Sequence, residues 1–260
     1  MGCTIAGRAK PRLLLVALCA GSGCSSPASS PEQPGPPTPQ HTPARTSGAV
    51  GDRTLGVGRT SDEPGRLVGS FVHTFYWMEF EADYSGPKDT QLAGKDCEPL
   101  ATVPKAFADR VCVEGTGRLA SGSLVNLFGN CGCGYACPDT GVSVCFFSAA
   151  DQSAPWGYGS HGNPLVPLRS IALADDVLPR GTVLYIPEWN GVAMPESDGL
   201  GGFLHDGCFR IDDVGYGVEG RHYDLYTGTS ALWQELEMLL PTDSSTTLYR
   251  DPPRCVGKVP

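Results

Sequence analysis

The chain has 260 residues, 40% of them hydrophobic, and a formal net charge of -9 at pH 7. This content suffices for a globular core, and the 34 glycines and 23 prolines favour turn-rich β structure with a linker over a helical bundle. An acidic chain without a basic stripe excludes nucleic acid as the partner, because neutralisation of phosphates supplies most of that affinity.

Residues 1–23 have the layout of an export signal. Three basic residues precede the apolar run 13–20, which is too short to span a bilayer. Small residues then lead to Cys24, as in a bacterial lipoprotein signal, although Gly21 stands where that signal usually has leucine. We therefore expect a lipoprotein signal peptide, lipidation of Cys24 and a place in the cell envelope, facing the periplasm or the exterior. An ordinary cleavage site without lipid is the alternative.

A segment rich in proline, serine, threonine and glycine follows at 24–66. It has few large apolar residues and cannot bury enough surface to fold, so a disordered linker is expected there. The folded region is expected over 67–260 as one domain and as a monomer. No later segment is apolar enough to span a membrane, so the lipid would be the only membrane contact.

The cysteines point to disulfide bonds. Two leave with the signal, and if lipid takes Cys24 an even number remains in an exported chain, which predicts a disulfide framework of unknown connectivity. Its members are Cys97, Cys112, Cys131, Cys133, Cys137, Cys145, Cys208 and Cys255. The run 131–145 could instead hold zinc, but it lacks paired C-x2-C knuckles, so we expect no metal and no cofactor.

Short strands dominate the expected secondary structure. The β-branched and aromatic run 70–78 predicts the first strand, and the others are expected at 110–114, 123–128, 142–147, 170–173, 182–187, 208–211 and 221–226. A cysteine-dense loop is expected at 129–139. The rhythm of the last four strands, punctuated by proline and glycine, is typical of a small barrel. One helix is expected at 231–240, where leucines share a face and Ser230 can cap it.

Three segments then carry a resemblance. Arg169–Ala172, Val177–Pro187 and Asp213–Asp224, in that order, resemble the 3D domain, named for its aspartates, and the catalytic barrel of the membrane-bound lytic transglycosylase A family. The most specific part is the spacing of Asp213 and Asp224 with glycines between them. The resemblance covers about residues 165–230. It implies an all-β protein built on a six-stranded double-psi β-barrel, with its core at about 160–250. A disulfide-rich β and loop extension would precede the barrel, and one short helix would follow it.

The family cleaves the MurNAc–GlcNAc bond of peptidoglycan and leaves a 1,6-anhydro sugar, which makes glycan strands the expected partner. Asp224 matches the family's catalytic acid/base, and Asp213 matches the second aspartate of the pair. Ala174 stands where the family has a further aspartate, and Glu219 stands where it has a lysine. These departures leave open a non-catalytic glycan-binding module, as in expansin-like proteins. A structural envelope lipoprotein that binds a protein partner is a third interpretation.

Strand alternation supports different roles for the two aspartates. In the last predicted strand, Tyr223 and Leu225 lie on one face and His222, Asp224 and Tyr226 on the other. If the apolar pair faces the barrel core, Asp224 points into a groove.

Asp213 has the parity of Phe209 and Ile211, so we expect it at a core-facing strand end or past a bulge. Burial there would raise its pKa, and two nearby carboxyls tend to share a proton, which is the condition that a general acid needs. The alternative is a turn-forming pair of aspartates that only holds the glycine loop.

Further polar and aromatic residues are candidates for binding the glycan: His222, Tyr226, Asp212, His205, Asp206, Trp156, Trp189 and Glu114. The His205–Asp206 pair could instead be a hydrogen-bonded start of a strand, and the two tryptophans could instead anchor loops or pack in the core. The sequence has no G-x-S-x-G elbow, H-E-x-x-H helix or phosphate loop.

Overall fold

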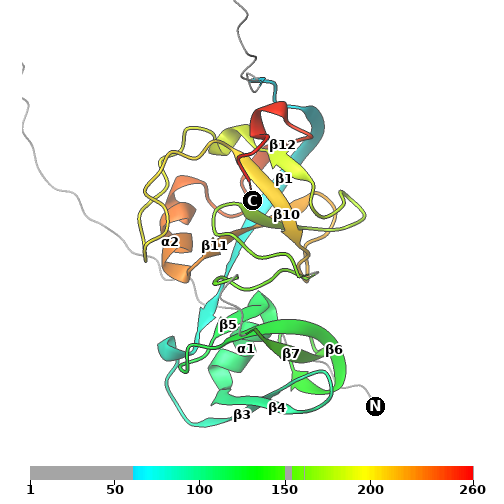
Figure 1. Ribbon diagram of the computed structural model, residues 1–260, viewed down its shortest axis with the longest axis vertical. Helices are drawn as coiled ribbons and strands as arrows, with labels where there is room; N and C mark the ends of the chain where they lie inside the picture. Colours follow the sequence, from blue (N-terminus) through cyan, green and yellow to red (C-terminus); the bar gives the residue numbers. More distant parts are fainter. Residues whose placement is uncertain (1–60, 150–153, 161, 260) are drawn as a thin grey trace, which may run out of the picture. The chain divides into compact units, whose positions relative to one another are not determined.

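The computed structural model describes residues 61–149, 154–160 and 162–259 (Figure 1). The predicted signal peptide, Cys24 and most of the predicted linker lie outside these residues. Among the helices of the described ranges, none is long and apolar enough to cross a membrane.

Six strands close into a barrel. They are β1 (Arg66–Trp77), β8 (Ser170–Leu173), β9 (Val183–Tyr185), β10 (Cys208–Asp213), β11 (His222–Gly228) and β12 (Ser245–Arg250). Their order is β1-β11-β8-β10-β9-β12. β1 pairs with β11 and β8 with β10 in parallel, and the other four pairs are antiparallel. The predicted six-stranded barrel is therefore confirmed, and closure leaves its strands without a free edge.

Alternation fills the barrel with apolar side chains. Its buried cluster includes Ile171, Leu173, Phe209, Ile211, Tyr223, Leu225 and the fully buried Trp189 at the end of the 3-10 turn η2 (Pro187–Trp189). The helix α2 (Ser230–Leu239) adds Leu232 and Leu236 to this cluster. Its cap is Thr229, whose hydroxyl accepts a hydrogen bond from the Leu232 amide at 3.2 Å, so the predicted cap at Ser230 is wrong by one residue.

A second sheet precedes the barrel strands β8–β12 in the chain. It contains β2 (Glu79–Phe80), β5 (Thr116–Arg118), β6 (Leu124–Ala136) and β7 (Ser143–Ala149), in the order β2-β5-β6-β7. A hairpin of β3 (Lys88–Ala93) and β4 (Pro99–Pro104) and the helix α1 (Lys105–Glu114) complete this part, with the 3-10 turn η1 (Glu81–Asp83). A third 3-10 turn, η3 (Pro253–Cys255), lies near the C-terminus.

The strand predicted at 110–114 is wrong, because these residues are the second half of α1. Phe107, Ala108, Val111 and Cys112 are buried at helical spacing against the second sheet, and this packing outweighs the β propensity of the valines. The helix ends at Gly115, which has the positive φ of 80° that a left-handed cap requires. The protein is thus mostly β sheet, as predicted, but has two α-helices among the described residues instead of one.

The disulfide framework is confirmed, since all eight predicted cysteines are paired. Cys131–Cys145 joins β6 to β7, Cys97–Cys133 joins the β3–β4 hairpin to β6, Cys112–Cys137 joins α1 to the residue after β6, and Cys208–Cys255 joins β10 to η3. The predicted cysteine-dense loop is largely the end of β6, which continues to Ala136.

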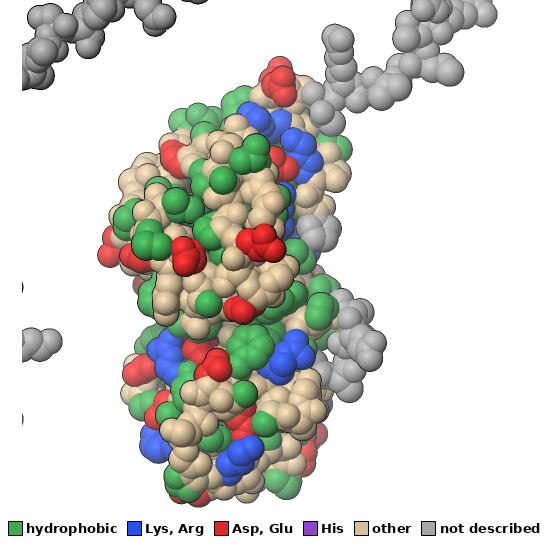
Figure 2. All heavy atoms as spheres, turned by 90° about the vertical axis from the view of Figure 1, so that its left-hand side faces the viewer, with side chains coloured by type: hydrophobic (Ala, Val, Ile, Leu, Met, Phe, Trp, Pro, Cys, Tyr) green, Lys and Arg blue, Asp and Glu red, His purple; other side chains and the backbone are tan. Residues whose placement is uncertain are grey.

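Figure 2 shows one face of the described residues, on which acidic and basic side chains lie among apolar ones.

Candidate active site

Asp213 and Asp224 lie on either side of the same residue. β8 runs between β10 and β11, and Ala172 of β8 is the register partner of Asp213 on one side and of Asp224 on the other. Neighbouring strands are about 4.8 Å apart, so the two aspartate backbones are about 10 Å apart. Directly paired residues point to one face of a sheet, so both carboxylates leave the barrel wall on the side of the Ala172 methyl group.

A bulge in β10 gives Asp213 this direction. Ile211 pairs with Ile171, but the next pairing joins Asp213 to Ala172, so Asp212 is an extra residue. Without the bulge, Asp213 would share the core-facing side of Ile211. The predicted position past a bulge is therefore the one that the structure shows.

Backbone groups hold the Asp213 carboxylate. Its Oδ1 accepts hydrogen bonds from the amides of Ser160 at 2.7 Å and Val214 at 2.8 Å, and the Tyr76 hydroxyl donates to Oδ2 at 3.5 Å. A Cβ on Gly159 would lie 2.2 Å from the Asp212 carbonyl oxygen, so only glycine lets this loop approach closely enough. Burial raises the pKa of Asp213 to about 6, although the hydrogen bonds oppose this rise.

Asp224 has different surroundings. Its Oδ1 is buried and has no hydrogen-bond partner among the described residues, and it lies 3.3 Å from Nε2 of His222. That nitrogen is 2.7 Å from the Thr74 hydroxyl, so its contact with Asp224 is an ion pair rather than an aligned hydrogen bond. The close carboxylate raises the pKa of His222. The side chain of Asp224 is 19% exposed, which leaves Oδ2 as the oxygen that a substrate can reach.

A third carboxylate comes from the second sheet region. Glu114 ends α1, accepts a hydrogen bond from the Trp77 amide at 3.2 Å and forms an ion pair with Arg110. Burial raises the pKa of Glu114 to about 7, with Arg110 opposing the rise. The Arg110 guanidinium also lies over the Trp77 ring at 5.7 Å, and Trp77 stacks on Trp233 of α2 at 4.7 Å. These contacts join α1 to the barrel.

All three carboxylates line one cavity of ≈ 500 Å³. The barrel contributes Tyr76, Ala172, Asp213, Asp224 and the turn after β10, and the second sheet region contributes Glu114 and residues of β5, β6 and β7. Such a concave site with few convergent polar groups is typical of a ligand-binding pocket.

Two exposed aromatic residues that the sequence analysis missed also line this cavity. Tyr216 in the glycine turn is 75% exposed, and Phe128 on β6 is 53% exposed. Exposed apolar side chains at a cavity mark a binding surface. The sequence signal that could have identified this binding surface is Tyr216, a large aromatic residue in a turn that is otherwise rich in glycine.

The other predicted site residues lie outside the cavity lining. His222 supports Asp224, as described above. Tyr226 is fully buried, packs against Tyr76 with ring centres 4.8 Å apart, and donates to the Trp156 carbonyl at 2.8 Å. Trp189 lies in the barrel core, and its indole faces the Tyr223 hydroxyl at 3.4 Å. These residues support the cavity wall from behind.

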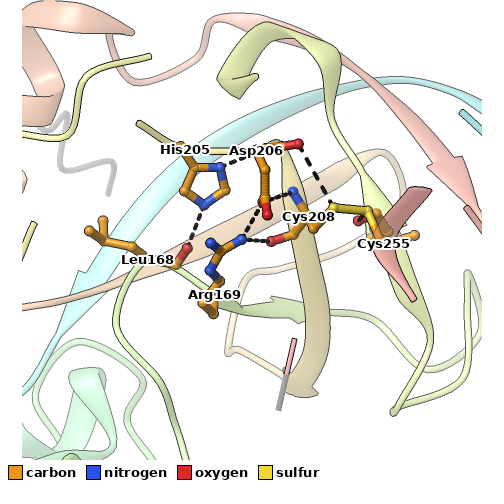
Figure 3. The surroundings of a disulfide bond; sticks show 8 residues. Leu168, Arg169, His205, Asp206, Cys208 and Cys255 are labelled. Atoms are coloured by element: carbon orange, nitrogen blue, oxygen red, sulfur yellow. Dashed lines mark hydrogen bonds and ion pairs between the residues drawn. A yellow bond between two sulfur atoms is a disulfide. The ribbon is translucent and has the colours of Figure 1, made fainter. Parts of the chain in front are cut away.

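Asp212, His205 and Asp206 also lie outside the cavity lining, and each is held by polar partners within the protein. Asp212 is buried and binds Arg210 and the Ser170 hydroxyl, each at 2.5 Å. Figure 3 shows His205 directed at the Leu168 carbonyl, 2.8 Å away.

The same view shows Asp206 between Arg169 and the amide of Cys208, next to the Cys208–Cys255 disulfide. Burial lowers the pKa of His205 to about 4. This pair therefore forms the hydrogen-bonded start of β10, which was the alternative interpretation.

The residues that depart from the family pattern lie at the margin of the site. Asp175, next to Ala174, forms an ion pair with Arg180, and Arg180 donates to the Ser160 hydroxyl at 2.7 Å. Ser160 in turn donates its amide to Asp213. An acid one position after Ala174 is thus connected to the site through Arg180, whereas Glu219 is exposed.

No protein-family model and no curated protein matches the chain. Among solved structures, it is similar to E. coli MltA with bound chitohexaose, with a TM-score of 0.46 and 16% identity over 71% of this chain and 72% of that chain. It is also similar to a membrane-bound lytic murein transglycosylase from Agrobacterium tumefaciens, with a TM-score of 0.43 and 12% identity over 74% and 75%. For the lytic transglycosylase LtgG of Burkholderia pseudomallei, the TM-score is 0.37 and the identity 16% over 70% and 72%.

Proposed function

We propose that this protein cleaves the glycan strands of peptidoglycan as a lytic transglycosylase, between MurNAc and GlcNAc, and forms 1,6-anhydro-MurNAc. The observation that carries the proposal is the placement of Asp213 and Asp224 on either side of Ala172, with both lining one cavity. The resemblance of the sequence around these aspartates supplies the type of reaction.

Asp224 is the acid and then the base in this proposal. Its carboxyl group donates a proton to the glycosidic oxygen as the bond from that oxygen to C1 of MurNAc breaks. The resulting carboxylate takes the proton of the C6 hydroxyl group, whose oxygen bonds to C1 and closes the anhydro ring. The proton returns to Asp224, and no water molecule is consumed. Asp224 suits this role because its side chain lines the cavity and is partly exposed there.

Asp213 is a positioning residue. Its two backbone donors fix its carboxyl group, and its raised pKa means that it carries a proton for part of the time near neutral pH. A neutral Asp213 limits repulsion across Ala172 when Asp224 becomes ionised. Tyr216 and Phe128 offer aromatic faces to the sugar rings.

The test is a digestion of purified sacculi with the wild type and with Asp224→Asn, followed by mass spectrometry for anhydro-muropeptides. We expect them from the wild type and none from the variant, while Glu235→Gln, an exposed acid of α2 outside the cavity lining, keeps full activity. No anhydro product from the wild type would overturn the enzymatic proposal. Sacculus binding without product would favour the glycan-binding module, and loss of all binding would favour the structural lipoprotein.

The envelope location also belongs to this proposal and rests on the sequence around Cys24. Labelled fatty acid should enter the wild type and not Cys24→Ser when both are produced in a bacterium with a lipoprotein pathway. Equal labelling of the two proteins would contradict lipidation at Cys24.

A further inference from the structure

Exposure separates one disulfide bond of the described residues from the other three. Both residues of Cys97–Cys133 are exposed, whereas each of the other bonds has at least one buried cysteine. These buried cysteines are at most 4% exposed, and they are Cys112, Cys137, Cys145, Cys208 and Cys255. Thiol–disulfide exchange requires a thiolate to reach a disulfide sulfur, so access limits its rate. An external thiol therefore reaches the Cys97–Cys133 bond before the others.

The backbone at Cys97 also favours opening of this bond. Cys97 lies in the turn between β3 and β4 and has a φ of 67°, in the left-handed region that residues with a side chain rarely adopt. Its amide donates to the Gly94 carbonyl at 3.0 Å and closes the turn. Once the disulfide is open, Cys97 is free to leave this unfavourable conformation. Exposed or strained disulfides are the ones that react most readily.

A bulge in β6 brings a second disulfide to the same place. Asn130 and Tyr135 both pair with Val144 of β7, so the residues between them bulge out of the strand. Cys133 lies in this bulge, and its sulfur is within 4.8 Å of both sulfurs of the Cys131–Cys145 bond. A thiolate released at Cys133 would therefore have a second disulfide within reach.

We propose that Cys97–Cys133 is a covalent modification site for small thiols, and that the exchange begun there is transferred to the Cys131–Cys145 bond. In the first step, the thiolate of the incoming thiol bonds to the Cys97 sulfur. The Cys97–Cys133 bond breaks, and its electron pair leaves with Cys133 as a thiolate. The incoming thiol is then held on Cys97 as a mixed disulfide.

In the second step, the Cys133 thiolate attacks the Cys145 sulfur. A Cys133–Cys145 bond forms, the Cys131–Cys145 bond breaks, and Cys131 leaves as a thiolate that takes up the proton lost by the incoming thiol. One thiol and two disulfides thus become one thiol, one mixed disulfide and one disulfide, so no oxidant is consumed. Cys145 is the target because a Cys131–Cys133 bond would span Gly132 alone, which restricts the geometry that a disulfide needs.

The transfer reaches the wall of the cavity. Cys131 directly follows Asn130, and Cys145 directly follows Val144, and both Asn130 and Val144 line the cavity. In the exchanged form, the cross-link between β6 and β7 moves from Cys131 to Cys133, away from the lining residues 128–130. The proposed modification therefore loosens this part of the wall without touching Asp213 or Asp224.

The first test treats the folded, oxidised protein with an equimolar amount of 2-mercaptoethanol, which is small and uncharged. After an acid quench, free thiols are alkylated, and peptides are mapped by mass spectrometry without reduction. We expect the adduct on Cys97, a Cys133–Cys145 bond and alkylated Cys131. The two bonds in which both cysteines are buried should open at least about tenfold more slowly. Earlier opening of either of those bonds, or an adduct on Cys97 without a Cys133–Cys145 bond, would overturn the inference.

Cys97→Ser tests the transfer without any reagent, because it leaves Cys133 with a permanent free thiol. We expect alkylation at both Cys133 and Cys131, since the two pairings with Cys145 then interconvert. A free thiol found at Cys133 alone would overturn the transfer. If this variant does not fold, the mapping of the wild type still decides.

Cys112→Ser is the matched control, because it also leaves one cysteine unpaired. Its former partner Cys137 is not a member of the cluster of three sulfurs, so the free thiol should stay on Cys137. Hydrogen exchange of residues 128–130 in the wild type, before and after the thiol reaction, measures the effect on the cavity wall. We expect faster exchange in the modified protein. Unchanged exchange after complete modification would overturn the coupling to the cavity.

Discussion

The imidazole of His222 lies 3.3 Å from Oδ1 of Asp224 and 2.7 Å from the hydroxyl of Thr74. Its other nitrogen lies 3.3 Å from the Gly217 carbonyl oxygen, to which an N–H at this position would donate. The histidine therefore connects the glycine turn, β1 and the proposed acid/base without lining the cavity.

His222→Gln should lower kcat about tenfold, because it removes a positioning contact and a positive charge from beside Asp224. The pKa of His222 is raised by Asp224, so the wild type should lose activity as the pH rises through that pKa, and the variant should lack this alkaline limb. Thr74→Val removes only the hydrogen bond and should keep the limb. Measurement of kcat from pH 5 to pH 9 separates the outcomes, and a limb at the wild-type pH in His222→Gln would contradict the assignment.

Ala172→Val should lower turnover strongly while the protein stays folded. The added methyl groups project from β8 into the space between Asp213 and Asp224, and Ala172 is itself buried, so we expect about 1–3 kcal/mol of overpacking cost. Ile171→Val, on the core side of the same strand, is the matched control. It should cost about 1 kcal/mol of unfolding free energy and leave turnover unchanged. Equal turnover in both variants would contradict the role of Ala172.

Asp213→Asn should change how stability depends on pH. The pKa of Asp213 is about 6 in the folded protein and 3.8 ordinarily, so the folded state binds the proton more tightly. Proton binding by Asp213 therefore stabilises the folded wild type fully below about pH 4. This contribution to the free energy of unfolding is lost as the pH rises to about 6.

The variant does not titrate at this position. Its free energy of unfolding, relative to that of the wild type, should therefore rise by on the order of 1–3 kcal/mol between pH 4 and pH 8. Urea unfolding at both pH values measures this difference, with the exposed Asp176→Asn as the charge-matched control. A relative stability that is the same at both pH values would contradict burial of the charge.

Tyr216→Ala and Phe128→Ala should weaken glycan binding without unfolding the protein. Both side chains are more than half exposed, so their removal should cost less than about 0.5 kcal/mol of stability. Each should raise KM for a soluble glycan fragment several-fold with a smaller effect on kcat. Met238→Ala on α2, 73% exposed and outside the cavity lining, is the control. An unchanged KM in both aromatic variants would exclude them from binding.

Removing the Cys208–Cys255 disulfide should destabilise the barrel. Its sequence separation is 47, so loss of the cross-link should lower the unfolding free energy by about 2–4 kcal/mol. The Cys131–Cys145 bond, with a separation of 14, should contribute about 1 kcal/mol less. Paired Cys→Ala variants in guanidinium unfolding test this order. Turnover at 25 °C should survive loss of Cys208–Cys255, because this bond lies outside the cavity lining.

Much of the barrel could be predicted from local pattern. Strand alternation in β11 placed Tyr223 and Leu225 in the core and Asp224 on the opposite face, as observed. The same reasoning failed for Tyr226, because the face opposite the barrel core is also covered, by Tyr76 and Trp156. Alternation tells which residues share a face, but it does not tell which part of that face meets solvent.

The helix α1 shows a second limit. The sequence predicts a strand at 110–114, whereas the burial of Val111 and Cys112 with Phe107 and Ala108 shows one face of a helix. That face packs against Leu92 and Val103, which precede it in the chain, and against Val125 and Phe146, which follow it. A short apolar segment is ambiguous until its packing partner is known.

The sequence by itself determined the parts that depend on local spacing: eight cysteines in the folded region, short alternating strands and two aspartates separated by a glycine turn. The tertiary structure alone decided that the bulge at Asp212 turns Asp213 outward, that Ala172 stands between the two aspartates, and that Glu114 and Phe128 reach the same cavity. The physical reason is that a cavity is formed by segments far apart in the chain, whose meeting depends on register and packing rather than on any local pattern.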